Sequence, residues 1–122
     1  MRVAAAETLS QRGDALAIRA LASTIDRPEF DEEPEGVKRA VMIGLAECAG
    51  VRAVPNLEPL LHRAEGWMPK RSVEDTAVVA VKALRQMRNA EAVRALRDAT
   101  RNKNRTVRDA ARAALQALKG AT

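Results

Sequence analysis

The chain has 122 residues, 47% of them apolar, and a net charge of +5. This length suits one domain, residues 1–122, with a useful core. It contains no run of eighteen apolar residues and begins without a signal-peptide pattern, which argues against membrane insertion and secretion. We therefore expect a cytoplasmic protein. Ala, Leu and Val dominate its apolar residues, with one Phe, one Trp and no Tyr, so we expect an all-α fold.

A repeat runs through the whole chain. One leucine recurs four times, each time with an apolar residue four positions earlier and a small residue just before it: Leu9, Leu45, Leu84 and Leu115. A second leucine follows twelve residues after each of the first three: Leu21, Leu57 and Leu96. The apolar spacing around both is i, i+3, i+4, which indicates two amphipathic helices joined by a tight antiparallel turn.

The repeat predicts seven helices. We place them at about 2–12, 15–25, 37–49, 52–65, 73–88, 90–102 and 106–119. Asp14, Ser72, Asn89 and Thr106 stand where an N-cap would accept a hydrogen bond from a free amide, and Gly13 suits a left-handed helix end. Pro59 removes an amide inside the fourth range, so this helix should kink or start late.

The connection over residues 26–35 is longer than a helix-to-helix turn needs. It is strongly acidic and includes Phe30, Glu32 and Glu33. Three interpretations are open: a docking strip for a basic partner with Phe30 as its anchor, a loose carboxylate cluster around a divalent cation, and a disordered insertion. The acidic residues do not have the spacing of a calcium-binding loop, which also needs a glycine at its turn, so we expect no metal site.

The connection Gly66 to Arg71 contains Trp67. An exposed Trp beside a methionine and two cations would suit a protein interface, where large aromatic residues dominate the binding energy. More commonly such a residue folds back as a lid over the ends of its own helices. Both interpretations are open, and we include Trp67 among the candidate contact residues.

The repeated stretches resemble the HEAT-repeat superfamily, particularly short bacterial units also found in phycobilisome-lyase-type proteins. They read MRVAAAETLSQRGDALAIRAL, VKRAVMIGLAECAGVRAVPNLEPLL, AVVAVKALRQMRNAEAVRALRDAT and VRDAARAALQALKG. The resemblance implies a right-handed α-solenoid of antiparallel helix pairs, with units at about 1–35, 36–71, 72–104 and 105–122. These are about three and a half HEAT units. The last unit has only a first helix, so the chain is either a fragment of a longer array or associates end to end.

Second helices of HEAT units usually line the concave face, so the resemblance directs attention to their outward positions. Arg94, Arg97 and Arg101 lie there at i, i+3 and i+7, and we call them the basic ridge; Arg19 holds a matching position in the first unit. Guanidinium groups bind carboxylates or phosphates through paired hydrogen bonds. The alternative is a solvated helix face on which Asp98 balances the charge.

Charge is unevenly distributed along the chain. Residues 1–67 carry 8 basic and 11 acidic side chains, and the remainder carry 13 and 5. A basic C-terminal half could contact a nucleic-acid backbone, although stacking aromatics are almost absent. His62 and Cys48, each the only residue of its type, lie on different helices and form no recognisable catalytic arrangement.

HEAT arrays are mostly protein-binding scaffolds, with minorities that bind nucleic acid or tetrapyrroles. We therefore predict a non-catalytic scaffold that binds another protein, without cofactor, metal or membrane. Nucleic-acid binding is the first alternative, and a lyase-type function in handling tetrapyrroles is the second.

Overall fold

The computed structural model describes residues 2–120, and all regular secondary structure among them is helical. Met1, Ala121 and Thr122, the outermost residues of the predicted first and last units, lie outside the described part. The all-α prediction is confirmed. The α-helices are α1 Val3–Arg12, α2 Ala15–Asp26, α3 Glu35–Ala49, α4 Val54–Arg63, α5 Arg71–Met87, α6 Ala90–Ala99 and α7 Arg105–Gly120; the 3-10 helices are η1 Pro28–Glu32 and η2 Gly50–Ala53.

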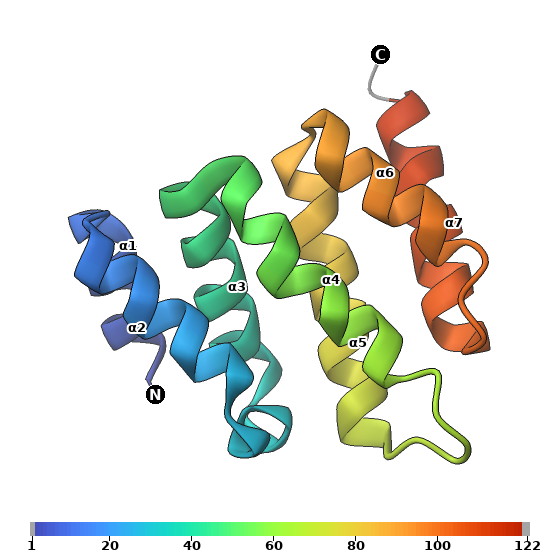
Figure 1. Ribbon diagram of the computed structural model, residues 1–122, viewed down its shortest axis with the longest axis horizontal. Coiled ribbons are helices and arrows are strands. Elements are labelled where there is room, and N and C mark those ends of the chain that lie inside the picture. Colours follow the sequence, from blue (N-terminus) through green and yellow to red (C-terminus); the bar gives the residue numbers. More distant parts are fainter. Residues whose placement is uncertain (1, 121–122) are drawn as a thin grey trace.

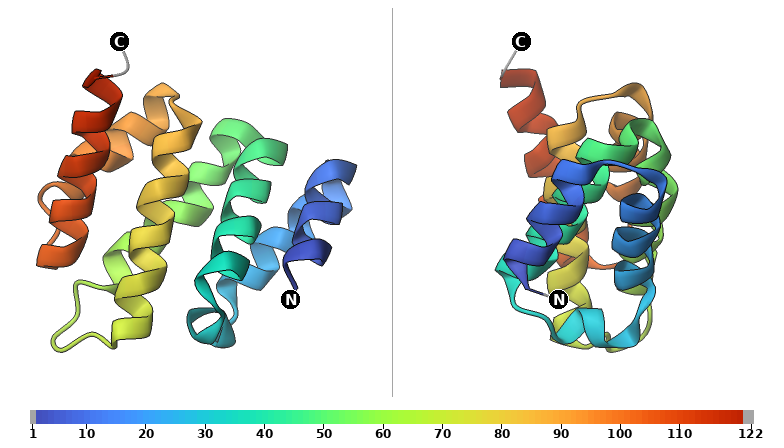
Figure 2. Two further views of the ribbon diagram at one scale, coloured as in Figure 1. Left: turned by 180° about the vertical axis from the view of Figure 1, so that it is seen from behind. Right: turned by 90° about the vertical axis from the view of Figure 1, so that its left-hand side faces the viewer.

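The helices form two layers (Figure 1). In the first layer, α1, α3, α5 and α7 lie side by side in chain order (Figure 2), and each packs against the next. In the second layer, α2 packs on α3, α4 on α5 and α6 on α7. Each second-layer helix consequently turns one face away from the first layer, and these outward faces of α2, α4 and α6 together make up what we call the second-layer face.

Two helix starts follow from side-chain caps that the sequence predicts. The carboxylate of Asp14 accepts a hydrogen bond from the Ala17 amide at 2.8 Å, and the Asn89 side chain accepts one from the Ala92 amide at the same distance. Gly13 takes the left-handed conformation (φ 61°) that ends α1 and lets the chain reverse into α2. These contacts stabilise the first and third hairpin turns.

The two other predicted caps are wrong. α5 begins at Arg71, so Ser72 lies inside its first turn, and Thr106 lies inside α7. Asn104 takes the capping role at α7, because its Oδ1 accepts a hydrogen bond from the Val107 amide at 3.2 Å. The caps were assigned to the wrong residues because Ser, Thr and Asn all favour the first position of a helix, and several of them stand near each start.

The fourth helix begins at Val54, two residues after the predicted start, and Pro59 lies inside it instead of delaying it. The 3-10 turn η2 precedes α4, which begins at Val54 with Pro55 in its first turn, where a missing amide costs nothing. The stretch Glu35–Arg63 is long and apolar enough to cross a membrane by length and composition alone. In the structure this stretch bends back on itself as α3 and α4, and 44% of its most apolar window is buried against other helices.

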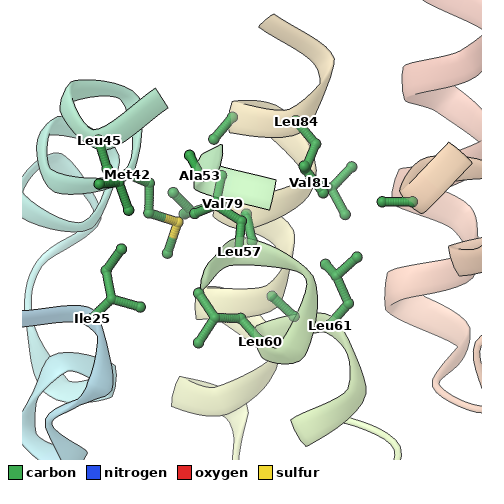
Figure 3. Close-up of a cluster of buried hydrophobic side chains, with 14 of the residues drawn as sticks. Ile25, Met42, Leu45, Ala53, Leu57, Leu60, Leu61, Val79, Val81 and Leu84 are labelled. Carbon is green, nitrogen blue, oxygen red and sulfur yellow. The ribbon is translucent and has the colours of Figure 1, made fainter. Parts of the chain in front are cut away.

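The hydrophobic core lies between the layers (Figure 3). Leucine, valine and methionine side chains from α3, α4 and α5 meet there, among them Met42, Leu57 and Val79, all 2% exposed or less. Close approach within the first layer requires small residues: a Cβ added at Gly44 would lie 3.2 Å from the Ser10 Cβ of α1. This contact explains why a small residue precedes Leu45 in the repeat.

Candidate partner-binding surface

The second-layer face carries both apolar and charged side chains. Leu16 on α2 is 63% exposed, although leucines are usually buried. The middle of the face is a shallow hollow along α4, lined by Pro55, Glu58, Pro59, His62 and Arg63. Proline rings have fixed shape, so this hollow presents a preformed apolar surface.

Arg94 is held by carboxylates of its own chain. Its guanidinium donates to both carboxylate oxygens of Glu58 on α4, at 3.0 and 3.2 Å. It also donates to Glu91 at 3.2 Å and to Asp98 at 2.8 Å on its own helix. These hydrogen bonds, chiefly the one from Glu58, raise the pKa of Arg94. Arg94 therefore joins α4 to α6, and carboxylates of its own chain already balance its positive charge.

Arg97 and Arg101 are the members of the basic ridge that remain available. Arg97 lies on α6, and Arg101 lies in the turn that follows it; both are exposed, and neither forms an ion pair with any residue between 2 and 120. Arg19 is exposed as well, but it lies on α2, and α4 separates it from α6 (Figure 1). The sixth helix is thus shorter than the predicted 90–102: Arg97 is on it, Arg101 follows its end, and Arg19 lies apart from both.

Two buried asparagines, which the sequence did not point to, fix the chain between α6 and α7. The Nδ2 of Asn102 donates to the Leu61 carbonyl at 3.0 Å, and the Nδ2 of Asn104 donates to the Ala64 carbonyl at 3.0 Å. Asn104 also donates to Glu74 on α5 at 2.8 Å. These bonds satisfy carbonyls at the C-terminal end of α4 that its own helix leaves free. The available signal was the pair of asparagines between two helical stretches, since Asn is typical of turns.

Glu65 adds a third side chain to the contacts between the connection after α6 and the end of α4. One carboxylate oxygen accepts from the Lys103 amide at 2.9 Å, and the other lies 2.8 Å from His62 Nδ1. The His62 contact, followed by the Lys103 amide, lowers the pKa of Glu65. The connection after α6 is thus attached to the end of α4 by side-chain and backbone groups.

The acidic connection is structured, and Phe30 is not on its surface. Residues 28–32 form η1, and Phe30 is 1% exposed within the core, so the prediction of Phe30 as an exposed anchor is wrong. Asp31 is also buried and pairs with Arg63 of α4. Glu32 remains exposed and Glu33 is partly buried, and both line a hollow beside the start of α5.

Trp67 is exposed, which excludes the lid interpretation. Its exposed fraction is 92%, and that of the neighbouring Met68 is 76%. Met68 has a positive φ of 52°, so the chain turns sharply at the tip of this connection. A large aromatic residue therefore projects from the protein beside a second apolar side chain.

Cys48 and His62 lie on different helices, α3 and α4, as the repeat predicts. Cys48 lies against α1, with its Sγ 3.1 Å from the Ser10 carbonyl oxygen, and His62 on α4 faces Glu65 of the connection that follows. Between residues 2 and 120, no group of three His, Cys, Asp or Glu side chains is placed to hold a metal ion. No family model matches the chain, and neither a curated protein nor a solved structure is significantly similar to it.

Proposed function

We propose that this chain is a non-catalytic scaffold that binds another protein through its second-layer face. In this proposal the two layers form a right-handed α-solenoid of HEAT type, with about three and a half units, and the second-layer face is its concave side. The alternation of α1, α3, α5 and α7 with α2, α4 and α6 supports it, as does the packing of each first-layer helix on the next.

The observation that carries the proposal is the contrast between Arg94 and the two arginines that follow it, Arg97 on α6 and Arg101 just after the helix. Arg94 pairs with three carboxylates, whereas Arg97 and Arg101 are exposed and lack an acidic partner among residues 2–120. Guanidinium groups without a partner favour carboxylate ligands. The proline-lined hollow lies on α4, which Arg94 joins to α6 through Glu58. This combination fits an extended acidic segment that also carries apolar side chains.

Arg94 contributes indirectly. By bridging α4 and α6 it fixes the hollow relative to Arg97 and Arg101, and a surface that is ordered before binding loses less entropy when it binds. Asn102 and Asn104 act on the same pair of units from the other end of α6.

Contact with a nucleic-acid backbone is the rival function. Arg97, Arg101, Lys103 and Arg105 follow one another along the end of α6 and the start of α7, and all are exposed. Clustered cations of this kind bind phosphates without sequence preference, and such binding weakens steeply as salt rises.

Two probes separate these functions: an extended peptide of glutamate and proline, and a short DNA duplex of arbitrary sequence. We expect the peptide to bind, and the double variant Arg97→Glu/Arg101→Glu to weaken its binding at least tenfold. Arg85→Glu/Arg112→Glu, on the first layer, is the control with the same change in charge and should bind like the wild type. Tighter binding of the duplex would favour nucleic-acid binding, provided that it weakens steeply with salt and is lost in Arg97→Glu/Arg101→Glu. Equal peptide binding by both variants would contradict the proposal.

A further inference from the structure

Two connections between units meet at one corner of the molecule (Figure 1, lower right). Residues 64–70 form a projecting loop there, and residues 100–105 are set back above its tip, an arrangement that Figure 2 also shows. The Lys103 amide donates to Glu65 at 2.9 Å, and Asn104 donates to the Ala64 carbonyl at 3.0 Å. The two connections therefore form one surface, although 38 to 40 residues separate the bonded groups in the chain.

The tip of the projecting loop is apolar. Trp67 and Met68 are the two most exposed large apolar side chains between residues 2 and 120. The hydrogen bonds at residues 64 and 65 hold the base of the loop, so Trp67 loses little conformational freedom when a partner covers it. Exposed apolar side chains on a fixed base favour burial in an interface.

The surface around this tip is basic. Lys70 follows Trp67 in the same loop, Lys103 and Arg105 come from the set-back connection, and all three are exposed. Neither lysine forms an ion pair with any residue between 2 and 120, and Arg105 makes a contact of 3.7 Å with Asp109. We give the name basic corner to Trp67, Met68, Lys70, Lys103 and Arg105.

The carboxylates that flank the projecting loop in the sequence already accept hydrogen bonds or lie on another surface. Glu65 accepts from the Lys103 amide, and Glu74 accepts from Asn104 at 2.8 Å. Asp75 lines the hollow beside η1. The two lysines of the basic corner therefore lack a carboxylate of their own chain, and they favour an acidic ligand.

The shape of the corner argues against a membrane as this ligand. The tip of 64–70 and the acidic turn η1 reach a similar level on the lower side of the molecule, whereas 100–105 is set back (Figures 1 and 2). Lys and Arg side chains are attracted to an anionic membrane, and acidic side chains are repelled. A flat anionic surface over Trp67 would thus meet Glu29 and Glu32, which are exposed on η1, and would not reach the cations of 100–105.

A single extended chain has no such conflict, because it can cross the tip and follow the corner back to 100–105. A single-stranded nucleic acid has this shape, but its binding relies on several stacking aromatic residues. This protein has one aromatic residue besides Trp67, and that residue, Phe30, is buried. The ligand that fits best is an acidic polypeptide segment.

We propose that the basic corner is a second docking site, which binds an acidic segment of a partner protein that carries an apolar side chain. The apolar side chain packs on Trp67 and Met68, and the acidic residues beside it face Lys70, Lys103 and Arg105. This site goes beyond the second-layer face and does not depend on it, since either surface can bind without the other.

The emission of Trp67, the only tryptophan in the chain, reports on this site. We expect an extended peptide of glutamates around a central leucine to shift this emission to the blue and to protect it from acrylamide. High salt should weaken the effect, because it screens the facing charges. The same peptide with serine in place of leucine should leave the emission nearly unchanged. Equal responses to the two peptides, or no response to the leucine peptide, would overturn the proposal.

Charge reversal locates the site. Lys70→Glu/Lys103→Glu should weaken binding of the leucine peptide at least about tenfold in a titration of the Trp67 emission. Arg52→Glu/Arg85→Glu is the matched control: both arginines are exposed, and they lie beyond the start of α4 and near the end of α5, away from the loop. The control should bind like the wild type. Equal weakening by the two variants would contradict a site at this corner.

Two further comparisons separate this site from the second-layer face and from other anionic ligands. Arg97→Glu/Arg101→Glu, which removes the free cations of the second-layer face, should keep the blue shift at saturating leucine peptide. Loss of the shift in this variant would show that the corner is not a separate site. A larger shift with vesicles of anionic phospholipid, or with single-stranded DNA, than with the peptide would overturn the choice of a protein segment.

Discussion

The two irregular connections of this chain begin from similar sequences and end in opposite environments. Each has one aromatic residue close to a proline and to charged side chains. Phe30 in the first is 1% exposed and belongs to the core, whereas Trp67 in the second is 92% exposed. The comparison shows that an aromatic residue in a loop is not by itself evidence for either a core contact or a binding site.

The backbone accounts for the difference. In the first connection, the Phe30 amide donates to Arg27 at 3.0 Å and the Glu33 amide to Phe30 at 3.1 Å, which closes a 3-10 turn. The ion pair of Asp31 with Arg63 then holds this turn over α4. The second connection has hydrogen bonds at its base, but its tip at Met68 turns outward with a positive φ.

The largest expected effect is that of Phe30→Ala. Removing a fully buried aromatic ring should lower the free energy of unfolding by about 3–5 kcal/mol. Urea denaturation followed by circular dichroism would measure this loss. A loss below about 1 kcal/mol would mean that Phe30 is not part of the core in solution.

Breaking the ion pair that holds the first connection should come next. Arg63→Met leaves Asp31 buried without its partner, and we expect a loss of about 2–3 kcal/mol, less than for a fully buried pair because Arg63 is 40% exposed. The double variant Asp31→Asn/Arg63→Met should recover part of this loss. If the double variant is as unstable as the sum of the single changes, the pair is not coupled.

Asn104→Ala tests what fixes the base of the second connection. It leaves the buried Ala64 carbonyl without a donor and removes the cap of α7, which should cost about 2 kcal/mol. Hydrogen exchange should also become faster in residues 64–70. Unchanged exchange there would show that the connection after α6 does not hold the Trp67 loop.

Trp67→Ala should leave stability within about 0.5 kcal/mol of the wild type, because the side chain makes little contact with its own protein. The measurement is urea denaturation at a protein concentration too low for association. A loss comparable to that of Phe30→Ala would erase the difference between the two connections.

The smallest effect concerns the Asp14 cap, which lies far from both connections. Hydrogen bonding from the Ala17 amide, and then from Arg12, lowers the pKa of Asp14. Its contribution to stability is therefore complete above the ordinary carboxylate range and disappears as pH falls through the lowered pKa of the folded state. Asp14→Asn keeps the hydrogen-bond acceptor and removes the titration. The stability of the wild type relative to this variant should decrease on acidification, and a constant difference would refute the assignment.

Helix periodicity could be predicted from the sequence because burial imposes it on every turn. The caps at Asp14 and Asn89 were also predictable, since each depends on a few neighbouring residues, but the effect of Pro59 was not, because α4 begins at Val54 and continues through it. The exposure of Phe30 and Trp67 could not be predicted, because it depends on a backbone turn and on the ion pair of Asp31 with Arg63, 32 positions away.

The basic ridge shows the same limit. Its sequence spacing was evident, but α6 ends before Arg101, and the charge of Arg94 is balanced by Glu58 of α4, which sequence spacing could not indicate. Asn102 and Asn104 likewise bond to carbonyls about forty residues earlier in the chain. Contacts between units determine which of the predicted site residues are free to bind a partner.

The emission of Trp67 in dilute solution tests most directly whether the second connection is left open for a partner. With no other tryptophan and no tyrosine in the chain, the signal comes from this residue alone. We expect the emission of an indole in water, strongly quenched by acrylamide, in the monomer. A blue-shifted emission that resists quenching at low concentration would place Trp67 against its own helices and contradict the account.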